Sequence, residues 1–132
     1  MFDSKIRVLV VDDMMTMRKM VGKALKEIGF TDITEAADGA LGWEAISGTK
    51  DAFGLIVSDW NMPNCTGLEL LKRVRGDSRL SKTPFVLVTA EAEQHQIVEA
   101  VKAGVSNYVI KPFTTESLRE KIEAVHRKLS QT

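Results

Sequence analysis

The sequence predicts an α/β fold, in which helices cover both faces of a mostly parallel sheet. Short apolar runs of strand length alternate with segments of helical periodicity along the whole 132-residue chain. No linker or low-complexity segment interrupts this alternation, and the length suits one domain with a sizeable core. We therefore expect a single domain over residues 1–132.

The first half of the chain is predicted to form three strands joined by two helices. Strands are expected at 8–11, 31–36 and 55–59, and the polar residues interleaved in the second are typical of a sheet edge. Gly29 is expected to end the first helix in a left-handed conformation, and Asp38 to cap the second. The predicted inward faces are Met17, Met20, Val21, Ala24, Leu25 and Ile28 in the first helix, and Leu41, Ala45 and Ile46 in the second.

The second half is predicted to contain three helices and two further strands. Thr66 and Glu69 have the spacing of a capping box, which marks the start of a third helix. Strands are expected at 85–89 and 107–110, with a fourth helix between them that ends at Gly104. The predicted inward faces are Ile97, Ala100 and Val101 in the fourth helix, and Leu118, Ile122, Val125 and Leu129 in the fifth.

This order of elements matches a flavodoxin-like, doubly wound, five-stranded parallel sheet of strand order 2-1-3-4-5. Ligands of such sheets bind outside the carboxyl ends of the strands, at the switch point between strands one and three. Asp12 and Asp13 follow the first strand, and Asp59 ends the third. We therefore expect these three carboxylates to share one edge of the sheet.

Two further polar side chains end strands at the same edge. Thr89 ends the fourth strand, and Lys111 follows the fifth. A cluster of like charges in a partly buried cleft disfavours ionisation, and a bound divalent cation that prefers oxygen ligands relieves the repulsion. The sequence therefore predicts a magnesium-type site with an ammonium beside it.

Each of these residues also has a purely structural interpretation. Asp13 could cap a helix that begins at Met14, Asp59 could be a turn residue, and Lys111 could be a solvated lysine. Taken one at a time, these interpretations are the more common ones. Together, however, they would require carboxylate, hydroxyl and ammonium side chains to stand at four separate strand ends by coincidence. The interpretation as a site is therefore favoured.

Composition excludes several other classes of function. Lys and Arg total 18, and Asp and Glu also total 18, so no net charge attracts the chain to nucleic acid or to an anionic membrane. The lone Cys65 rules out an internal disulfide. The first residues form neither a signal peptide nor a membrane span. We expect a cytoplasmic monomer.

Four strand-end segments together resemble the receiver domains of two-component response regulators. These segments are Asp12-Asp13, Ser58-Asp59-Trp60-Asn61-Met62-Pro63-Asn64, Thr89-Ala90-Glu91-Ala92 and Tyr108-Val109-Ile110-Lys111-Pro112-Phe113. The similarity covers nearly the whole chain. The pair Met17-Arg18 and the segment 67–72 resemble the single-domain chemotaxis regulators more than receivers in general.

The resemblance implies a phosphoryl acceptor. Asp59 corresponds to the aspartate that takes a phosphoryl group from a sensor histidine kinase. Asp13, Asp59 and the backbone carbonyl of Asn61 would bind Mg²⁺ directly, and Asp12 would bind it through a water. Lys111 would pair with Asp59 and then with the phosphoryl group, and its bond to Pro112 is cis in the family.

The resemblance also implies a switch. Thr89 would supply a hydroxyl to the phosphoryl group, and Tyr108 would then rotate inward, although a tyrosine at a strand end is often ordinary packing. Asn61 and Glu91 occupy positions that tune dephosphorylation. The changed surface, around 97–103, the fifth strand and Lys121, would meet a flagellar switch protein, and a dedicated phosphatase is a further possible partner.

Some residues depart from the chemotaxis pattern and leave alternatives open. Glu93-Gln94 stand where two lysines are common, so a paralogue with a non-flagellar target is an alternative. An aspartyl phosphatase would also use an aspartate, Mg²⁺ and a lysine, but it needs a second aspartate where this chain has Asn61. A flavin or nucleotide carrier would need glycines after the first strand, where Asp12 is followed by Asp13 and Met14.

Overall fold

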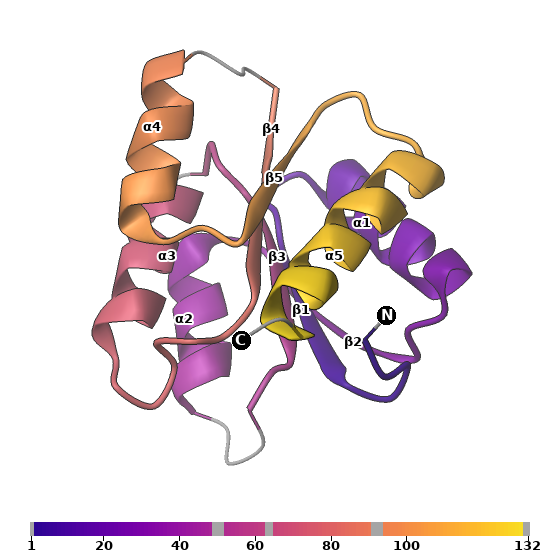
Figure 1. The fold of residues 1–132 in the computed structure, drawn as a ribbon, viewed down its shortest axis with the longest axis horizontal. Helices are drawn as coiled ribbons and strands as arrows, with labels where there is room; N and C mark the ends of the chain where they lie inside the picture. Colours follow the sequence, from indigo (N-terminus) through magenta and orange to yellow (C-terminus); the bar gives the residue numbers. More distant parts are fainter. Residues whose placement is uncertain (1, 49–51, 63–64, 91–93, 131–132) are drawn as a thin grey trace.

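The computed structural model describes residues 2–48, 52–62, 65–90 and 94–130 (Figure 1). The strands are β1 (Arg7–Val11), β2 (Asp32–Ala36), β3 (Leu55–Asp59), β4 (Phe85–Thr89) and β5 (Asn107–Ile110). They form one parallel sheet in the order β2-β1-β3-β4-β5. The predicted fold and strand order are confirmed.

Helices cover both faces of this sheet. The helices are α1 (Met15–Ile28), α2 (Gly39–Ser47), α3 (Gly67–Gly76), α4 (Gln94–Ala103) and α5 (Thr115–Ser130). Figure 1 shows α1 and α5 on one side of the sheet and α2, α3 and α4 on the other. None of the helices in the described part of the chain combines the length and hydrophobicity needed to cross a bilayer.

Alternating side chains of the central strands build two separate cores. Leu9 and Leu87 point toward the α2, α3 and α4 side, whereas Val10 and Val86 point toward α1 and α5. Successive residues of a strand face opposite sides of the sheet, so a strand covered by helices on both faces is apolar at every position. For this reason β1, β3 and β4 are almost continuous runs of apolar residues.

The predicted helix ends are confirmed. Gly29 and Gly104 have φ angles of 129° and 91°, a region that glycine adopts without strain. The Asp38 side chain accepts a hydrogen bond from the Leu41 N–H at 2.8 Å. Thr66 and Glu69 form the expected capping box at the start of α3.

Several predicted inward positions are wrong. Met20 is 51% exposed, Leu41 47%, Val101 62% and Leu129 43%. Helical spacing shows which residues share a stripe but does not place the centre of that stripe. In α1 the buried stripe runs through Val21 and Leu25, and α4 lies at the rim of the fold beside α3 (Figure 1).

Candidate functional site

The parallel register brings the carboxyl ends of three strands to one edge of the sheet. Val11 of β1 is paired with Ser58 of β3, and Asp59 of β3 is paired with Val88 of β4. Asp12 therefore begins the loop after β1 beside Asp59, and Thr89 ends β4 one residue further along. Asp12, Asp59 and Thr89 are nevertheless buried, so these polar groups lie at an edge that still excludes most solvent.

Three carboxylates meet at this edge. One carboxylate oxygen from each of Asp12, Asp13 and Asp59 lies within 4.8 Å of the others. Asp12 is 2% exposed and Asp59 is 6% exposed, whereas Asp13 is exposed. We refer to these three residues as the acid cluster. The cluster is thus anchored on two buried carboxylates and opens to solvent through the third.

The Lys111 ammonium contacts two carboxylates of the acid cluster. Its Nζ donates a hydrogen bond to Asp59 Oδ1 at 2.8 Å and lies 3.9 Å from Asp12 Oδ2. The backbone N–H of Lys111 donates to the Thr89 carbonyl at 2.8 Å, which fixes the chain that carries the ammonium. The Lys111-Pro112 peptide bond is cis, as the resemblance implies.

One ammonium does not balance the acid cluster. Burial raises the pKa of Asp12 above its ordinary value, and the carboxylates of Asp59 and Asp13 raise it further. The Met14 N–H, which donates to Asp12 Oδ1 at 2.9 Å, and Lys111 act in the opposite direction. The Asp12 anion is therefore held at a cost in free energy, which a further cation at this edge would lower.

The donor set suits a hard divalent cation. All three side chains of the acid cluster offer carboxylate oxygens, which Mg²⁺ and Ca²⁺ prefer. Ligands on opposite sides of a Mg²⁺ octahedron lie about 4.2 Å apart, because each bond measures about 2.1 Å. The observed 4.8 Å limit on the oxygen separations is close to that span, so small side-chain movements would close the cluster on an ion.

The loop after β3 is held close to the sheet. The Trp60 N–H donates to the Val88 carbonyl at 3.0 Å, and the Trp60 carbonyl accepts from the Gly67 N–H at 2.9 Å. Gly67 has no room for a side chain, because a Cβ there would overlap the Asp59 carbonyl oxygen. Trp60 is buried and Asn61 is exposed beside Asp59. The close approach of α3 thus fixes the backbone of Asp59.

Arg18 is a further residue at this edge whose role the sequence did not reveal. Its Nη1 donates to the Asp12 carbonyl at 2.9 Å, and its Nε donates to Glu35 Oε1 at 3.0 Å. Lys19 binds the other Glu35 oxygen at 2.9 Å. The only signal in the sequence was the pair Met17-Arg18, which carried part of the resemblance without a role for the arginine.

The two predicted switch residues lie on neighbouring strands. Thr89 is buried at the end of β4, and Tyr108 of β5 is half-buried, in register with Leu87. The Lys121 ammonium of α5 lies 5.2 Å from the centre of the Tyr108 ring, within the range of a cation–π contact. Glu91, the other residue predicted to tune dephosphorylation, lies outside the described residues.

Comparisons with known proteins agree with this geometry. Residues 8–123 match the family model of the response regulator receiver domain. Chemotaxis protein CheY of Pseudomonas aeruginosa is 44% identical over 125 residues, which cover 95% of this chain and 99% of that protein. Chemotaxis protein CheY1 of Helicobacter pylori is 42% identical over 120 residues, which cover 91% and 96%.

A solved structure of similar sequence has the same fold. Chemotaxis protein CheY4 of Vibrio cholerae superposes with a TM-score of 0.83 at 33% identity, covering 92% of this chain and 98% of that one. This chain resembles CheY proteins over nearly its full length. It also has the strand order, the acid cluster and the Lys111 contact described above. The chain belongs to the response regulator receiver domain family, as a CheY-like member.

Proposed function

We propose that this CheY-like receiver accepts a phosphoryl group on Asp59 from a CheA-like sensor histidine kinase. The observation that carries the proposal is the position of Asp59 in the acid cluster, with the Lys111 ammonium on one of its carboxylate oxygens. A carboxylate is a weak nucleophile toward phosphorus. The phosphorus of the donor must be held in line for its attack, and the negative charge of the phosphoryl group must be neutralised. Asp59 is the buried carboxylate that Lys111 holds most closely.

In the proposed reaction a carboxylate oxygen of Asp59 attacks the phosphorus of a phosphohistidine. The phosphorus–nitrogen bond breaks, an acyl phosphate forms, and the histidine leaves with the electron pair of that bond. Lys111 pairs with Asp59 before transfer and is placed to pair with a phosphoryl oxygen afterwards, because its Nζ already lies 2.8 Å from Asp59 Oδ1. The ammonium thus stays at the developing negative charge.

We propose that Asp13, Asp59 and the Asn61 backbone carbonyl hold Mg²⁺, with Asp12 acting through a bound water. When bound, the ion would neutralise charge on the transferring phosphoryl group. The buried Asp12 carboxylate shapes the anionic wall of the site, since its Oδ1 accepts from the Met14 N–H and its backbone carbonyl accepts from Arg18. Asn61 is exposed at the mouth of the site, which fits a role in phosphoryl lifetime.

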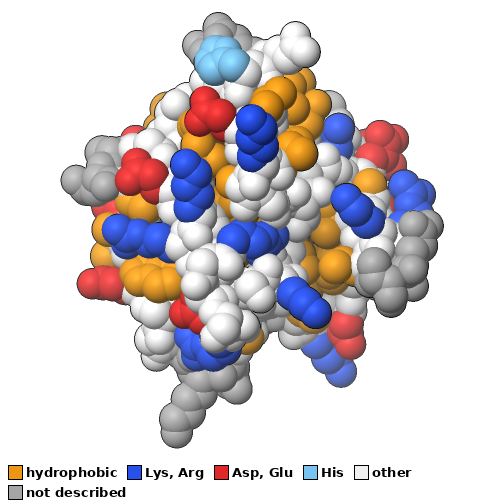
Figure 2. Space-filling view, turned by 60° about the vertical axis from the view of Figure 1, so that its left-hand side comes forward, with side chains coloured by type: hydrophobic (Ala, Val, Ile, Leu, Met, Phe, Trp, Pro, Cys, Tyr) orange, Lys and Arg blue, Asp and Glu red, His pale blue; other side chains and the backbone are white. Residues whose placement is uncertain are grey.

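The proposed readout runs from Thr89 to Tyr108. The Thr89 hydroxyl would bond a phosphoryl oxygen, and the space it leaves would admit the Tyr108 ring. The surface that this change reaches carries exposed apolar side chains: Val98 is 43% exposed, Val101 62% and Ile110 47%. Figure 2 shows hydrophobic side chains among lysines and arginines on the face turned toward the viewer.

A FliM-like flagellar switch protein is the proposed target of this α4-β5-α5 surface. A non-flagellar target is the alternative, because Glu93-Gln94 replace two lysines that are common in CheY proteins. Glu93 and Glu91 lie outside the described residues. A CheZ-like phosphatase is proposed to end the signal. Its action would be tuned at Asn61 and Glu91.

The first test is labelling of the protein by a phosphohistidine donor in the presence of Mg²⁺. Mass spectrometry of the intact chain should show the gain of one phosphoryl group, which disappears in Asp59→Asn. Asp32→Asn is the matched control, because it removes an exposed carboxylate at the start of β2. Labelling that survives in Asp59→Asn would overturn the proposal, and release of many product equivalents from a phosphate ester would favour the phosphatase.

The second test is Mg²⁺ titration followed by Trp60 fluorescence. A Trp43→Phe background removes the other tryptophan of the chain, so the emission reports the loop next to Asp59. We expect a saturable change with a dissociation constant of roughly 1 mM, as for a solvent-open site that keeps several waters. An unchanged response in Asp13→Ala would contradict the proposed ligand set.

A third test identifies the partners. The chain with and without beryllofluoride, which stands in for a phosphoryl group on Asp59, should be mixed with purified flagellar switch and kinase proteins. Enhanced binding of the switch protein supports the chemotaxis assignment, and its absence supports another target. The single domain over 1–132, the monomeric state and the cytoplasmic location stay predictions.

A further inference from the structure

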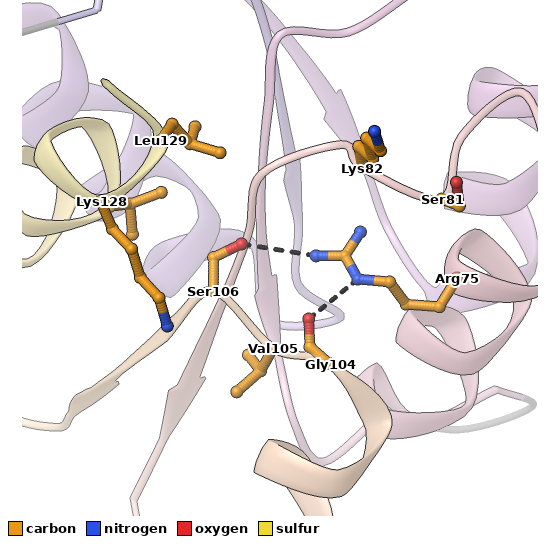
Figure 3. A pocket seen from close by; sticks show the side chains of 9 residues that line it. Arg75, Ser81, Lys82, Gly104, Val105, Ser106, Lys128 and Leu129 are labelled. Carbon is orange, nitrogen blue, oxygen red and sulfur yellow. Dashed lines mark hydrogen bonds between the residues drawn. The ribbon is translucent and has the colours of Figure 1, made fainter. Parts of the chain in front are cut away.

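A cavity lies at the opposite end of the sheet from the acid cluster. It has a volume of about 420 Å³ and opens between the end of α3, the loop before β4, the turn before β5 and the end of α5 (Figure 3). These segments come before the amino ends of β4 and β5, whereas the acid cluster follows the carboxyl ends of β1 and β3. The cavity is therefore separate from the proposed phosphorylation site.

The guanidinium of Arg75 forms the centre of this cavity. Its Nε donates to the Gly104 carbonyl at 2.8 Å, and its Nη1 donates to the Thr83 carbonyl at 2.6 Å. Its Nη2 makes a long contact of 3.4 Å with the Ser106 hydroxyl. Arginine has five N–H donors, so these three bonds leave two donors for another ligand.

The positive charge of Arg75 has no carboxylate partner in the described part of the chain. All three groups that accept from it are uncharged. Burial lowers the pKa of Arg75 below its ordinary value, which shows that the surroundings disfavour the cation. A half-buried charge without a counter-ion is unfavourable, and an anion in the cavity would compensate it.

Two lysines add to the positive charge of the cavity. Lys82 extends from the loop before β4, and Lys128 extends from α5 on the other side of Arg75 (Figure 3). Neither lysine forms an ion pair with a described carboxylate. No acidic residue lines the cavity among the described residues. Three cationic residues thus line one cavity, with no acidic residue among its described lining.

The remaining wall of the cavity is apolar. Val105, Val125 and Leu129 lie beside the cationic groups. Leu129 is 43% exposed instead of packing into the core as its helical spacing predicted. Ligand sites of small molecules combine such an apolar wall with a few polar groups and have volumes of about 300–1,000 Å³. The cavity suits a ligand with an anionic group at one end and an apolar ring at the other.

We propose that this cavity binds a phosphorylated nucleoside of mononucleotide size. The phosphate would lie among Arg75, Lys82 and Lys128, where guanidinium and ammonium groups make charge-assisted hydrogen bonds to its oxygens. The base would lie against Val125 and Leu129 of α5. This site is independent of Asp59 chemistry, because none of its lining residues belongs to the acid cluster.

The test uses AMP as the probe in the presence of EDTA, so that no metal ion links the nucleotide to the acid cluster. Isothermal calorimetry should give a saturable dissociation constant between about 10 µM and 1 mM. Nuclear magnetic resonance should show shifts of the Gly104 and Ser106 amides. Adenosine, which lacks the phosphate, should bind at least about tenfold more weakly.

A pair of double variants separates the cavity from general charge effects. Lys82→Gln with Lys128→Gln should weaken AMP binding about tenfold at low ionic strength, since each exposed cation contributes modestly. Lys72→Gln with Lys102→Gln removes the same charge from exposed positions outside the cavity and should leave binding unchanged. Thermal unfolding checks that both variants fold.

Three results would overturn the proposal. These are the absence of saturable binding, equal weakening in the two double variants, and amide shifts confined to the acid cluster. Failure of AMP binding with intact labelling of Asp59 would leave the proposed receiver function in place. Loss of Asp59 labelling with intact AMP binding would overturn the proposed receiver function and leave the proposed nucleotide site in place.

Discussion

Replacing Gly67 with alanine tests how the fold positions Asp59, the proposed phosphoacceptor. A Cβ at Gly67 would overlap the Asp59 carbonyl oxygen and lie 2.8 Å from Leu87 Cδ2. The backbone cannot easily move away, because the Gly67 N–H is bonded to the Trp60 carbonyl and the Trp60 N–H to the Val88 carbonyl. The variant must therefore displace the loop that carries Asp59 or distort the start of α3.

The expected loss of stability can be set against a control in the same helix. Overpacking costs about 1–3 kcal/mol, and the better helix propensity of alanine returns at most about 1 kcal/mol. Gly76, at the other end of α3, has no atom within 4 Å of an added Cβ. Gly76→Ala should be stabilising by about 0.5 kcal/mol, so the two variants should differ by about 2 kcal/mol.

Urea unfolding measures this difference directly. With a denaturant dependence of about 2 kcal/mol per molar, the midpoints of the two variants should differ by about 1 M. Gly67→Ala should also weaken the Trp60 response to Mg²⁺, since Asp59 is displaced. Equal midpoints for the two variants would refute the inference that the close approach at Gly67 fixes the Asp59 backbone.

Three further changes test individual contacts. Lys19 first, and then Arg18, lower the pKa of Glu35 below its ordinary value of 4.5. The folded state thus favours the Glu35 anion, so its contribution is present above pH 4.5 and is lost as the pH falls through the lower folded pKa. Glu35→Gln should destabilise by about 1 kcal/mol near pH 7 and progressively less as the pH falls below 4.5, and a difference in urea midpoints that does not shrink on acidification would contradict this. Lys111→Met removes the cation beside Asp59, so Trp60 fluorescence should report several-fold tighter Mg²⁺ binding while labelling of Asp59 slows about 100-fold; unchanged values of both would exclude the assigned role. Arg75→Lys cannot bridge the Gly104 and Thr83 carbonyls together and should cost about 2 kcal/mol in urea unfolding, whereas Arg73→Lys, at an exposed site, should stay within about 0.5 kcal/mol.

The strand ends were predictable because their signals are local. A parallel strand covered on both faces is apolar throughout, so the first polar residue marks the end of the run. Asp12 and Thr89 follow such runs directly, and Asp59 follows one after the buried Ser58. The parallel topology then places them at one edge. The grouping of the acid cluster therefore needed only the order of the elements and the direction of the strands.

The inward faces of the helices were predicted less well because they depend on neighbours. Val101 shares a helical stripe with Ala100 and Ile97, yet α4 lies at the rim of the fold and buries Ala100 while leaving Val101 exposed. Leu129 continues the stripe of Leu118 and Ile122, but it lies beyond the core and lines the cavity around Arg75. Helical periodicity shows which residues share a stripe, but it does not show how far neighbouring elements cover that stripe.

The roles of two arginines could not be predicted from the sequence for a different reason. Arg18 binds the Asp12 carbonyl and Glu35, and Arg75 binds the Gly104 carbonyl. The contacts to Asp12 and Gly104 join residues from different parts of the fold through a backbone carbonyl, which every residue possesses. No residue type at the accepting position therefore marks the pairing, and only the assembled fold shows it.

The position of Tyr108 under the Lys121 ammonium has a practical consequence for spectroscopy. Tyr108 is the one tyrosine of the sequence, so a chain grown with fluorotyrosine would carry a single fluorine label. The chemical shift of that fluorine depends on the electric field across the ring and hence on the distance to the ammonium. If phosphorylation moves the Tyr108 ring as proposed, one spectrum would display the two ring positions as separate resonances, and their areas would give the two populations.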